Sequence, residues 1–244
     1  TFVYIDGTQG WVNVLDSTSN VRGATFVTAT VSGACNTLTT APDCANVKVA
    51  TFTGPGTFCV SSIATVTAEN TIGYMAIAGG GSGGGANGGG GGGGGFREGR
   101  NVPIDNFTAS PLVADYPGPN SNEITVTATG YPITVGGGGA STPSSGNPFG
   151  SKGNNSVVSS ITAAAGGAGS AGQWCAPTAP SNSPGGSGAG GGYDFPGGAP
   201  VNITYPTYRG TGNTPSVTPS QGTDGGGGNN NWSTAVSAGG GGGA

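Results

Sequence analysis

The sequence of 244 residues contains no histidine, and Asp, Glu, Lys and Arg together make up only 7 % of it. Histidine is the most frequent general base, proton shuttle and metal ligand, so its absence excludes His-dependent catalysis. The net charge is −4, and the basic residues are scattered: Arg22, Lys48, Arg97, Arg100, Lys152 and Arg209. Because no cationic stripe could neutralise a row of phosphates, we expect no nucleic-acid partner.

Leucine and methionine are scarce too, with three Leu and a single Met. Amphipathic helices need an apolar residue every three to four positions, which this composition cannot supply. Val, Ile and Thr dominate instead, and these residues favour strands. We therefore predict an all-β fold with essentially no α-helix. No long apolar run occurs, and the chain starts at Thr1 without a signal-like segment, so we expect a fragment or a processed chain.

The four cysteines, Cys35, Cys44, Cys59 and Cys175, form no C-x-x-C pair and have no histidine to join them. A zinc site is therefore not expected, and nothing else in the sequence indicates a metal or cofactor. A disulfide such as Cys35–Cys44, across the segment NTLTTAPD, fits an extracellular setting, although the sequence leaves other pairings open.

The first third of the chain reads as β structure. Residues 1–22 predict a hairpin, with TFVYID and WVNVLD on either side of Gly7 and Gly10. Residues 23–78 contain short β-rich runs, such as ATFVTATV, VKVATFT and YMAIA, separated by turn clusters. We predict an antiparallel β segment there, and a third region over residues 79–244.

Glycine dominates that third region, and the whole chain holds 55 Gly, about 23 % against the roughly 7 % that is usual. Four glycine runs directly follow strand-like apolar segments, at 74–85, 131–140, 159–172 and 233–244. A flexible linker has no need to follow a strand each time, so we expect the runs to be an ordered internal repeat.

Polyglycine can form the polyproline II helix, which has three residues per turn and rises about 3.1 Å per residue. Helices without side chains can pack backbone to backbone, with N–H···O=C bonds and Cα–H···O contacts between neighbours. Ordering costs glycine more entropy than any other residue, so only several runs together should be stable. We predict a polyglycine II helix bundle over residues 79–244. We expect the interrupting side chains to point outward or to the edge of the bundle: Ser82, Ala86, Asn87, Ala168, Ser170, Ser187 and Ala189.

The segments between the glycine runs are rich in proline and aromatic residues, and we interpret them as rigid displayed loops. They cover residues 96–122, 141–155, 173–184 and 193–224.

A series of motifs in fixed order carries a resemblance to a known family. These are TFTGPGTFCV, YMAIAGGGSGGG with a long glycine run ending in FRE, YPITVGGGGA, NSVVSSITAAAGG and GTGNTPSVTPSQGTDGGGG. From about Ala24 to Ala244 the chain resembles the glycine-rich domain of tail-fibre and structural proteins of marine, cyanophage-like bacteriophages. In architecture it is similar to the tip adhesins of T-even-like long tail fibres, whose polyglycine II sandwich presents connecting loops to the host receptor.

The resemblance implies an extracellular virion protein at the distal end of a tail fibre, with residues 1–22 joining it to other fibre chains. Tail fibres are commonly homotrimers, whereas the tip adhesins resemble single-copy caps, so the oligomeric state stays open. The run ITAAAGGAGSAG is diluted by Ala relative to the family, and we expect it at the edge of the bundle. Residues 1–78 do not match the attachment region of the T-even adhesins.

Loop aromatic residues can stack on sugar faces or fill apolar receptor grooves. Our receptor-binding candidates are Trp174, Tyr193, Phe195, Tyr205, Tyr208, Arg209, Phe96, Arg97, Phe107, Tyr116 and Phe149, with Trp232 beside them. The arginines, Arg100 included, suit acidic sugars or phosphates through bidentate contacts. The alternative is that each aromatic residue covers its own loop and each arginine is a solvated charge. Asp105, Asp115 and Asp194 are too sparse to indicate a glycosidase pair, so we expect no enzyme activity.

The function that these features favour is a non-enzymatic adhesin that binds a host surface glycan or outer-membrane protein. A structural filament subunit without a receptor role is the alternative. An ice-binding protein is a more remote one, since polyglycine bundles can also present flat faces.

Overall fold

The computed structural model describes residues 2–4, 11–13, 25–42, 44–85, 88–102, 104–105, 107–116, 123–143, 149–171, 183–192, 203–205, 209–231 and 235–244. Side chains are described for these residues except at 2–4, 11–13, 44–46, 116, 203–205, 229–231 and 235–237. Within this part of the chain, no helix is long and apolar enough to cross a membrane.

The largest sheet has five antiparallel strands in the order β14-β13-β12-β6-β3. Their bounds are Thr28–Ser32 for β3, Gly56–Ser62 for β6, Gly130–Thr134 for β12, Ser156–Val158 for β13 and Ile161–Ala163 for β14. β12, β13 and β14 come from beyond residue 78, so this sheet crosses the predicted boundary between the second and third regions.

A second sheet of three strands has the order β10-β9-β8, with β8 at Tyr74–Ile77, β9 at Phe96–Asn101 and β10 at Val113–Tyr116. β8 and β9 are antiparallel, whereas β10 runs parallel to β9. The apolar core is built around Val60, Tyr74, Ile124, Val126 and Ile161, which joins this sheet to the five-stranded one.

The remaining sheets are small. β7 (Thr71–Ile72) pairs with β11 (Ile124–Thr125), and β4 (Thr37–Ala41) pairs with β5 (Cys44–Thr51). β1 (Phe2–Tyr4) pairs antiparallel with β2 (Trp11–Asn13). β15, β16 and β17 form a three-stranded sheet with bounds Ile203–Tyr205, Gly228–Asn231 and Ala235–Ser237.

The one helical element in the described residues is a 3-10 turn, η1, at Thr67–Glu69. The fold is therefore all-β with essentially no helix, which confirms the prediction drawn from the scarcity of Leu and Met.

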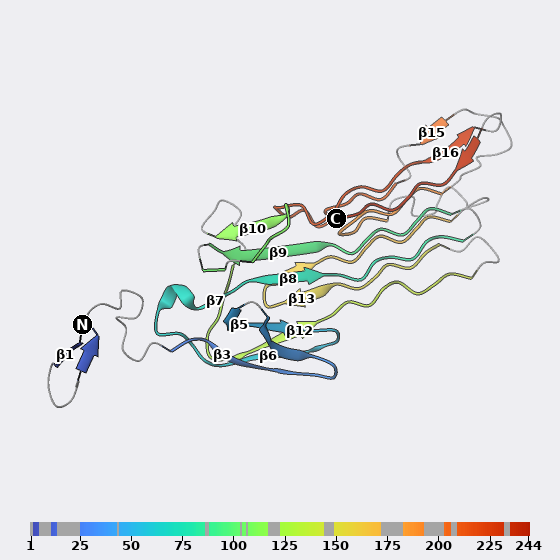
Figure 1. Ribbon diagram of the computed structural model, residues 1–244. Helices are drawn as coiled ribbons and strands as arrows, with labels where there is room; N and C mark the ends of the chain where they lie inside the picture. The colour runs from blue at the N-terminus through green and yellow to red at the C-terminus, as the bar shows by residue number, and fades with distance from the viewer. Residues whose placement is uncertain are drawn as a thin grey trace.

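The glycine-rich runs lie side by side and connect the sheets to the β15–β16–β17 sheet (Figure 1). β8, β9 and β14 adjoin the runs 78–85, 88–95 and 164–171 at one end, which we call the base end. The run 221–228 leads into β16, and β17 leads into the run 238–244, at the opposite or far end.

Backbone hydrogen bonds between neighbouring runs recur every third residue. The antiparallel runs 78–85 and 88–95 show the pattern most simply. Their bonds join Ala78 N–H to Gly95 O at 3.1 Å, Gly81 N–H to Gly92 O at 2.9 Å and Gly84 N–H to Gly89 O at 2.9 Å.

Successive amides of one run donate to different neighbours. In the run 88–95, the amides of residues 89, 92 and 95 donate to the run 164–171, and those of 90 and 93 donate to the run 238–244. The same run accepts bonds from 78–85 and 183–192. It is thus bonded to four neighbours, whereas a strand within a sheet is bonded to two.

Most positions in the runs have no room for a side chain. A Cβ on Gly94 would overlap the carbonyl oxygen of Ala78, and one on Gly241 would overlap that of Gly91. Nothing lies within 4 Å of a Cβ on Gly240 or Gly243, by contrast. Among the described glycines only Gly33 has a positive φ, of 98°. Close approach of backbones, not left-handed conformation, therefore makes glycine necessary in the runs.

Two of the interrupting side chains do not point outward, so the prediction was wrong for Ser187 and Ala189, which are 0 % and 1 % exposed. Ser187 fits inside because the glycines around it leave a small space: its Oγ lies 3.7 Å from a Cβ placed on Gly93. Ser82, Ala168 and Ser170 are half-buried, and Ala86 and Asn87 lie outside the described residues.

The alanine-containing run 164–171 lies inside the array, not at its edge as predicted. It shares bonds with the runs 78–85, 88–95, 149–155 and 183–192. The amide of Ala165 donates to Asn155 Oδ1 at 2.8 Å, and that of Ala168 donates to Ser183 Oγ at 2.7 Å. A side-chain acceptor spans a wider gap than a backbone carbonyl, so these positions leave room for a methyl group.

Candidate functional site

The structure separates the predicted binding residues between the two ends of the glycine runs. Tyr205 lies on β15 at the far end, where it pairs with Gly228 of β16. Phe149 starts a run at the same end and is half-buried. Four further candidates, together with Trp232, lie outside the described residues: Trp174, Tyr193, Phe195 and Tyr208.

Arg209 follows β15 on the return toward the base end and is half-buried. Its Nη2 lies 3.4 Å from Asp224 Oδ2. The other carboxylate oxygen, Oδ1, accepts a bond from the amide of Gly212 at 2.9 Å. This ion pair fixes the returning segment against the run 221–228.

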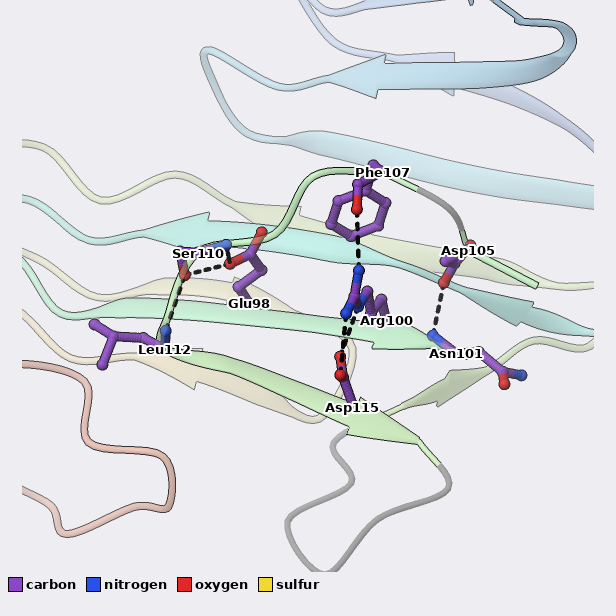
Figure 2. Close-up of polar contacts among 8 residues, drawn as sticks. All are labelled: Glu98, Arg100, Asn101, Asp105, Phe107, Ser110, Leu112 and Asp115. Atoms are coloured by element: carbon purple, nitrogen blue, oxygen red, sulfur yellow. Dashed lines mark hydrogen bonds and ion pairs between the residues drawn. The ribbon is translucent and has the colours of Figure 1, made fainter. Parts of the chain in front are cut away.

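The other four candidates, Phe96, Arg97, Phe107 and Tyr116, lie on β9, β10 and the connection between them at the base end. Figure 2 shows the polar contacts that hold this connection, residues 102–112, against the two strands. Phe96 is half-buried and Phe107 is 41 % exposed. For Tyr116 only the backbone is described.

Arg100 is the centre of these contacts. Its Nε and Nη2 donate to the two carboxylate oxygens of Asp115 at 2.6 and 3.1 Å, and its Nη1 donates to the carbonyl of Phe107 at 3.0 Å. Because β9 and β10 are parallel neighbours with Arg100 opposite Asp115, the fork is formed directly across the strand pair. Arg100 is therefore a positioning group for the connection, not an arginine held ready for a ligand.

Two further carboxylates bind the same connection. Glu98 Oε2 accepts bonds from both the amide and the hydroxyl of Ser110, with the amide at 2.9 Å. Asp105 Oδ2 accepts the amide of Asn101 at 2.8 Å. Three side chains thus pin the connection, and they hold Val102, Ile104 and Phe107 in solvent, at 36 %, 43 % and 41 % exposure.

The electrostatics of Asp115 do not suit a catalytic acid. The hydrogen bond from Arg100 lowers the pKa of Asp115, and the same bond raises the pKa of Arg100. A glycosidase acid needs a carboxyl whose pKa is raised. Among the described residues no group of three His, Cys, Asp or Glu side chains could hold a metal ion.

Arg97 faces the opposite side of the sheet from Arg100 and is only 7 % exposed. The sequence treats it as a loop charge, but β9 begins one residue earlier and places it inside. No hydrogen bond or ion pair among the described residues involves Arg97, whereas the hydroxyl of neighbouring Tyr74 is buried and has no partner there.

The predicted Cys35–Cys44 disulfide is not formed in the structure. Cys35 precedes β4 and is a free, exposed thiol, while Cys44 pairs with Ala41 at the turn of the β4–β5 hairpin. The two residues therefore lie at opposite ends of the hairpin, about 20 Å apart along a strand. A disulfide needs Cα atoms within about 7 Å.

Sequence reasoning missed Gln221, which is fully buried at the base end of the run that it starts. Its Oε1 accepts the amide of Ala164 at 2.8 Å, its Nε2 donates to the carbonyl of Pro215 at 2.8 Å, and its own carbonyl accepts the amide of Phe96 at 2.9 Å. The signal in the sequence is weak: a single amide side chain at the start of a glycine run.

In comparisons with known proteins, no family profile, curated protein sequence or solved structure matches this chain.

Proposed function

We propose that this chain is a bacteriophage tail-fibre adhesin, in which a polyglycine II helix bundle carries receptor-binding loops. The observation that carries the proposal is the recurrence of inter-run hydrogen bonds at every third residue, with each run serving up to four neighbours. Three residues per turn is the repeat of the polyproline II helix. The absence of positive φ among the described glycines of the runs supports the same geometry.

Such a bundle is a rigid spacer, because its runs are joined to one another along their length. It separates the base-end sheets from the far end, where β15, β16 and β17 lie (Figure 1). We infer that the far end contacts the host, through Tyr205 and the predicted aromatic candidates beside it in the sequence. The partner is a surface glycan or an outer-membrane protein, since aromatic side chains suit both. Enzyme activity forms no part of this proposal.

Adsorption of the fluorescently labelled chain to a panel of marine bacterial isolates, cyanobacteria included, tests the proposal. The double substitution Tyr205→Ala with Tyr208→Ala should reduce cell-bound fluorescence at least tenfold. The matched control is Phe107→Ala, which removes an exposed aromatic residue at the base end and should leave binding unchanged. If no isolate binds the chain, or if both variants bind as well as the parent, the adhesin role is contradicted.

A filament subunit remains the second candidate, and one observation favours it. The amides of Gly240 and Gly243 have no backbone partner among the described residues, and the space beside both glycines is open. A second bundle could dock there by the contacts that join the runs within one chain. Long regular polymers in electron micrographs of the purified chain would support this reading, and monodisperse particles would argue against it.

A further inference from the structure

The run 238–244 leaves one row of backbone amides facing solvent, which we call the donor edge. The amides of Gly239 and Gly242 donate to an inner run, whereas those of Gly240 and Gly243 have no partner among the described residues. Gly240 and Gly243 are exposed, and nothing lies within 4 Å of a Cβ placed on either. They are three residues apart, about 9.3 Å in a polyproline II helix. The open row therefore repeats at the same interval as the rows that are bonded inside the array.

The run 135–143 leaves a matching row of carbonyl groups, which we call the acceptor edge. This run is bonded to its two neighbours through the amide of Gly139 and the carbonyl of Gly137. The carbonyls of Gly138 and Ser141 accept no bond from the described residues, and both residues are exposed. They too are three residues apart. The partial negative charge of these carbonyls complements the partial positive charge of the donor edge.

Neither edge is protected against docking. Exposed backbone edges are commonly blunted by charged side chains or by proline, and residues 136–142 and 238–244 contain neither. The two edges lie on different sides of the array, and their runs share no bonded neighbour (Figure 1). In a single copy, water satisfies the open groups. Both edges are therefore available to another backbone that has the same repeat.

The direction of the bonds inside the array selects the occupant. The run 88–95 only donates to 164–171 and 238–244, and it only accepts from 78–85 and 183–192. A two-fold axis between two copies of the run 238–244 would require bonds in both directions, because the symmetry repeats every bond. The donor edge therefore needs an acceptor row from a different run. A β-strand is excluded as well, because its outward groups recur at about 6.7 Å.

We propose that copies of this chain associate side by side, with the donor edge of one copy on the acceptor edge of the next. The amides of Gly240 and Gly243 then donate to the carbonyls of Gly138 and Ser141 of a second copy. The contact is heterologous, so each pair keeps one free edge of each kind and further copies can add. This association goes beyond the adhesin role and does not depend on it. For the filament alternative, it names the two surfaces that meet.

Sedimentation velocity of the full chain over a wide range of concentration tests the association. The mean mass of the parent should rise beyond that of a dimer. Gly240→Glu combined with Gly243→Glu should block the donor edge, Gly138→Glu should block the acceptor edge, and each variant alone should stay monomeric. All three positions have room, since a Cβ on Gly138 lies 3.6 Å from its nearest atom, so both variants should unfold at the temperature of the parent. The matched control is Thr37→Glu with Thr39→Glu, which adds two charges on exposed β4 and should associate like the parent.

An equimolar mixture of the two edge variants gives the sharpest result. Each variant keeps the edge that the other has lost, so the mixture should form dimers and nothing larger. A parent that is monomeric at every concentration, a mixture that stays monomeric, or an edge variant that associates by itself would each overturn the proposal. Cell adsorption of the monomeric donor-edge variant tests the adhesin role separately.

Hydrogen exchange in the parent decides the question if an edge variant fails to fold. Protection of the amides of Gly240 and Gly243 should rise at least tenfold as concentration increases. The amide of Gly241 belongs to a different row of the helix and should not change. Equal behaviour of the three amides rejects the contact.

Discussion

Alanine at Gly241 and alanine at Gly240 should have opposite effects on stability, although the two residues are adjacent in one run. A Cβ on Gly241 would overlap the carbonyl oxygen of Gly91, so the run 238–244 must move away from the run 88–95. A Cβ on Gly240 meets nothing within 4 Å, and the backbone there has no positive φ.

The size of each effect follows from the bonds at stake. The run 238–244 is held to its inner neighbours by four backbone bonds: Gly239 N–H to Gly191 O, Gly242 N–H to Gly188 O, Gly90 N–H to Gly239 O and Gly93 N–H to Gly242 O. At about 1 kcal/mol for each bond, losing two to four of them makes Gly241→Ala destabilising by about 2–4 kcal/mol. Gly240→Ala should stabilise by about 0.4–1 kcal/mol, because alanine reduces the entropy of the unfolded chain.

Calorimetric unfolding of the two variants measures the difference, and hydrogen exchange at the amides of Gly239 and Gly242 locates it. A second pair in an inner run guards against simple fraying of the C-terminus. Gly94→Ala should be destabilising, since its Cβ would overlap the carbonyl oxygen of Ala78, whereas a Cβ on Gly93 lies 3.4 Å from its nearest atom and should be tolerated better. Equal losses within either pair would refute the claim that backbone contact dictates where glycine is needed.

Two further predictions concern the base end. The pKa of Asp115 is lowered by Arg100, so the contribution of this ion pair is present above the ordinary carboxyl pKa of about 3.8 and is lost as pH falls through the lower value in the folded chain. Protection of residues 102–112 from hydrogen exchange should therefore be constant from pH 7 to 5 and fall below about pH 4. Asp115→Asn should show weak protection at every pH. A loss of protection in the parent chain already near pH 6 would contradict the claim that the Arg100–Asp115 ion pair supplies it. Gln221→Met should destabilise by about 1–3 kcal/mol, because the amide of Ala164 loses its buried acceptor. Exposed Asn154 is the matched control, and Asn154→Met should cost less than half as much in the same denaturation experiment.

The composition was sufficient to predict the class of fold. Too few Leu and Met residues for helices, together with abundant Val, Ile and Thr, left strands as the main regular structure, and the described residues have this character. The coupling of strands to glycine runs also indicated that the runs are built into the fold. The composition gave no sign that one sheet spans the predicted division at residue 78. β12, β13 and β14 pair in the same sheet as β6 and β3, from which long stretches of sequence separate them.

The side chains inside the glycine array were harder to place. Ser187 and Ala189 look like exceptions in the sequence, yet the absence of side chains on facing runs makes space for them. Arg97 follows a glycine run and resembles a loop charge, but the strand phase of β9 directs it to the inner face and Arg100 to the outer one. Shifting the phase of the strand by one residue would exchange the two faces. The sequence alone therefore could not tell that Arg100 positions the connection and that Arg97 is buried.

The three-residue repeat does little to specify the register between neighbouring glycine runs. The eight glycines from 88 to 95 are identical, so sliding that run by one repeat would exchange each bond for an equivalent one. Only the residues that are not glycine can distinguish the native alignment from its translated copies. Ser187 fits its small space, and Gln221 makes its hydrogen bond to Ala164, at one register only. These two side chains therefore fix the register of the runs while the chain folds.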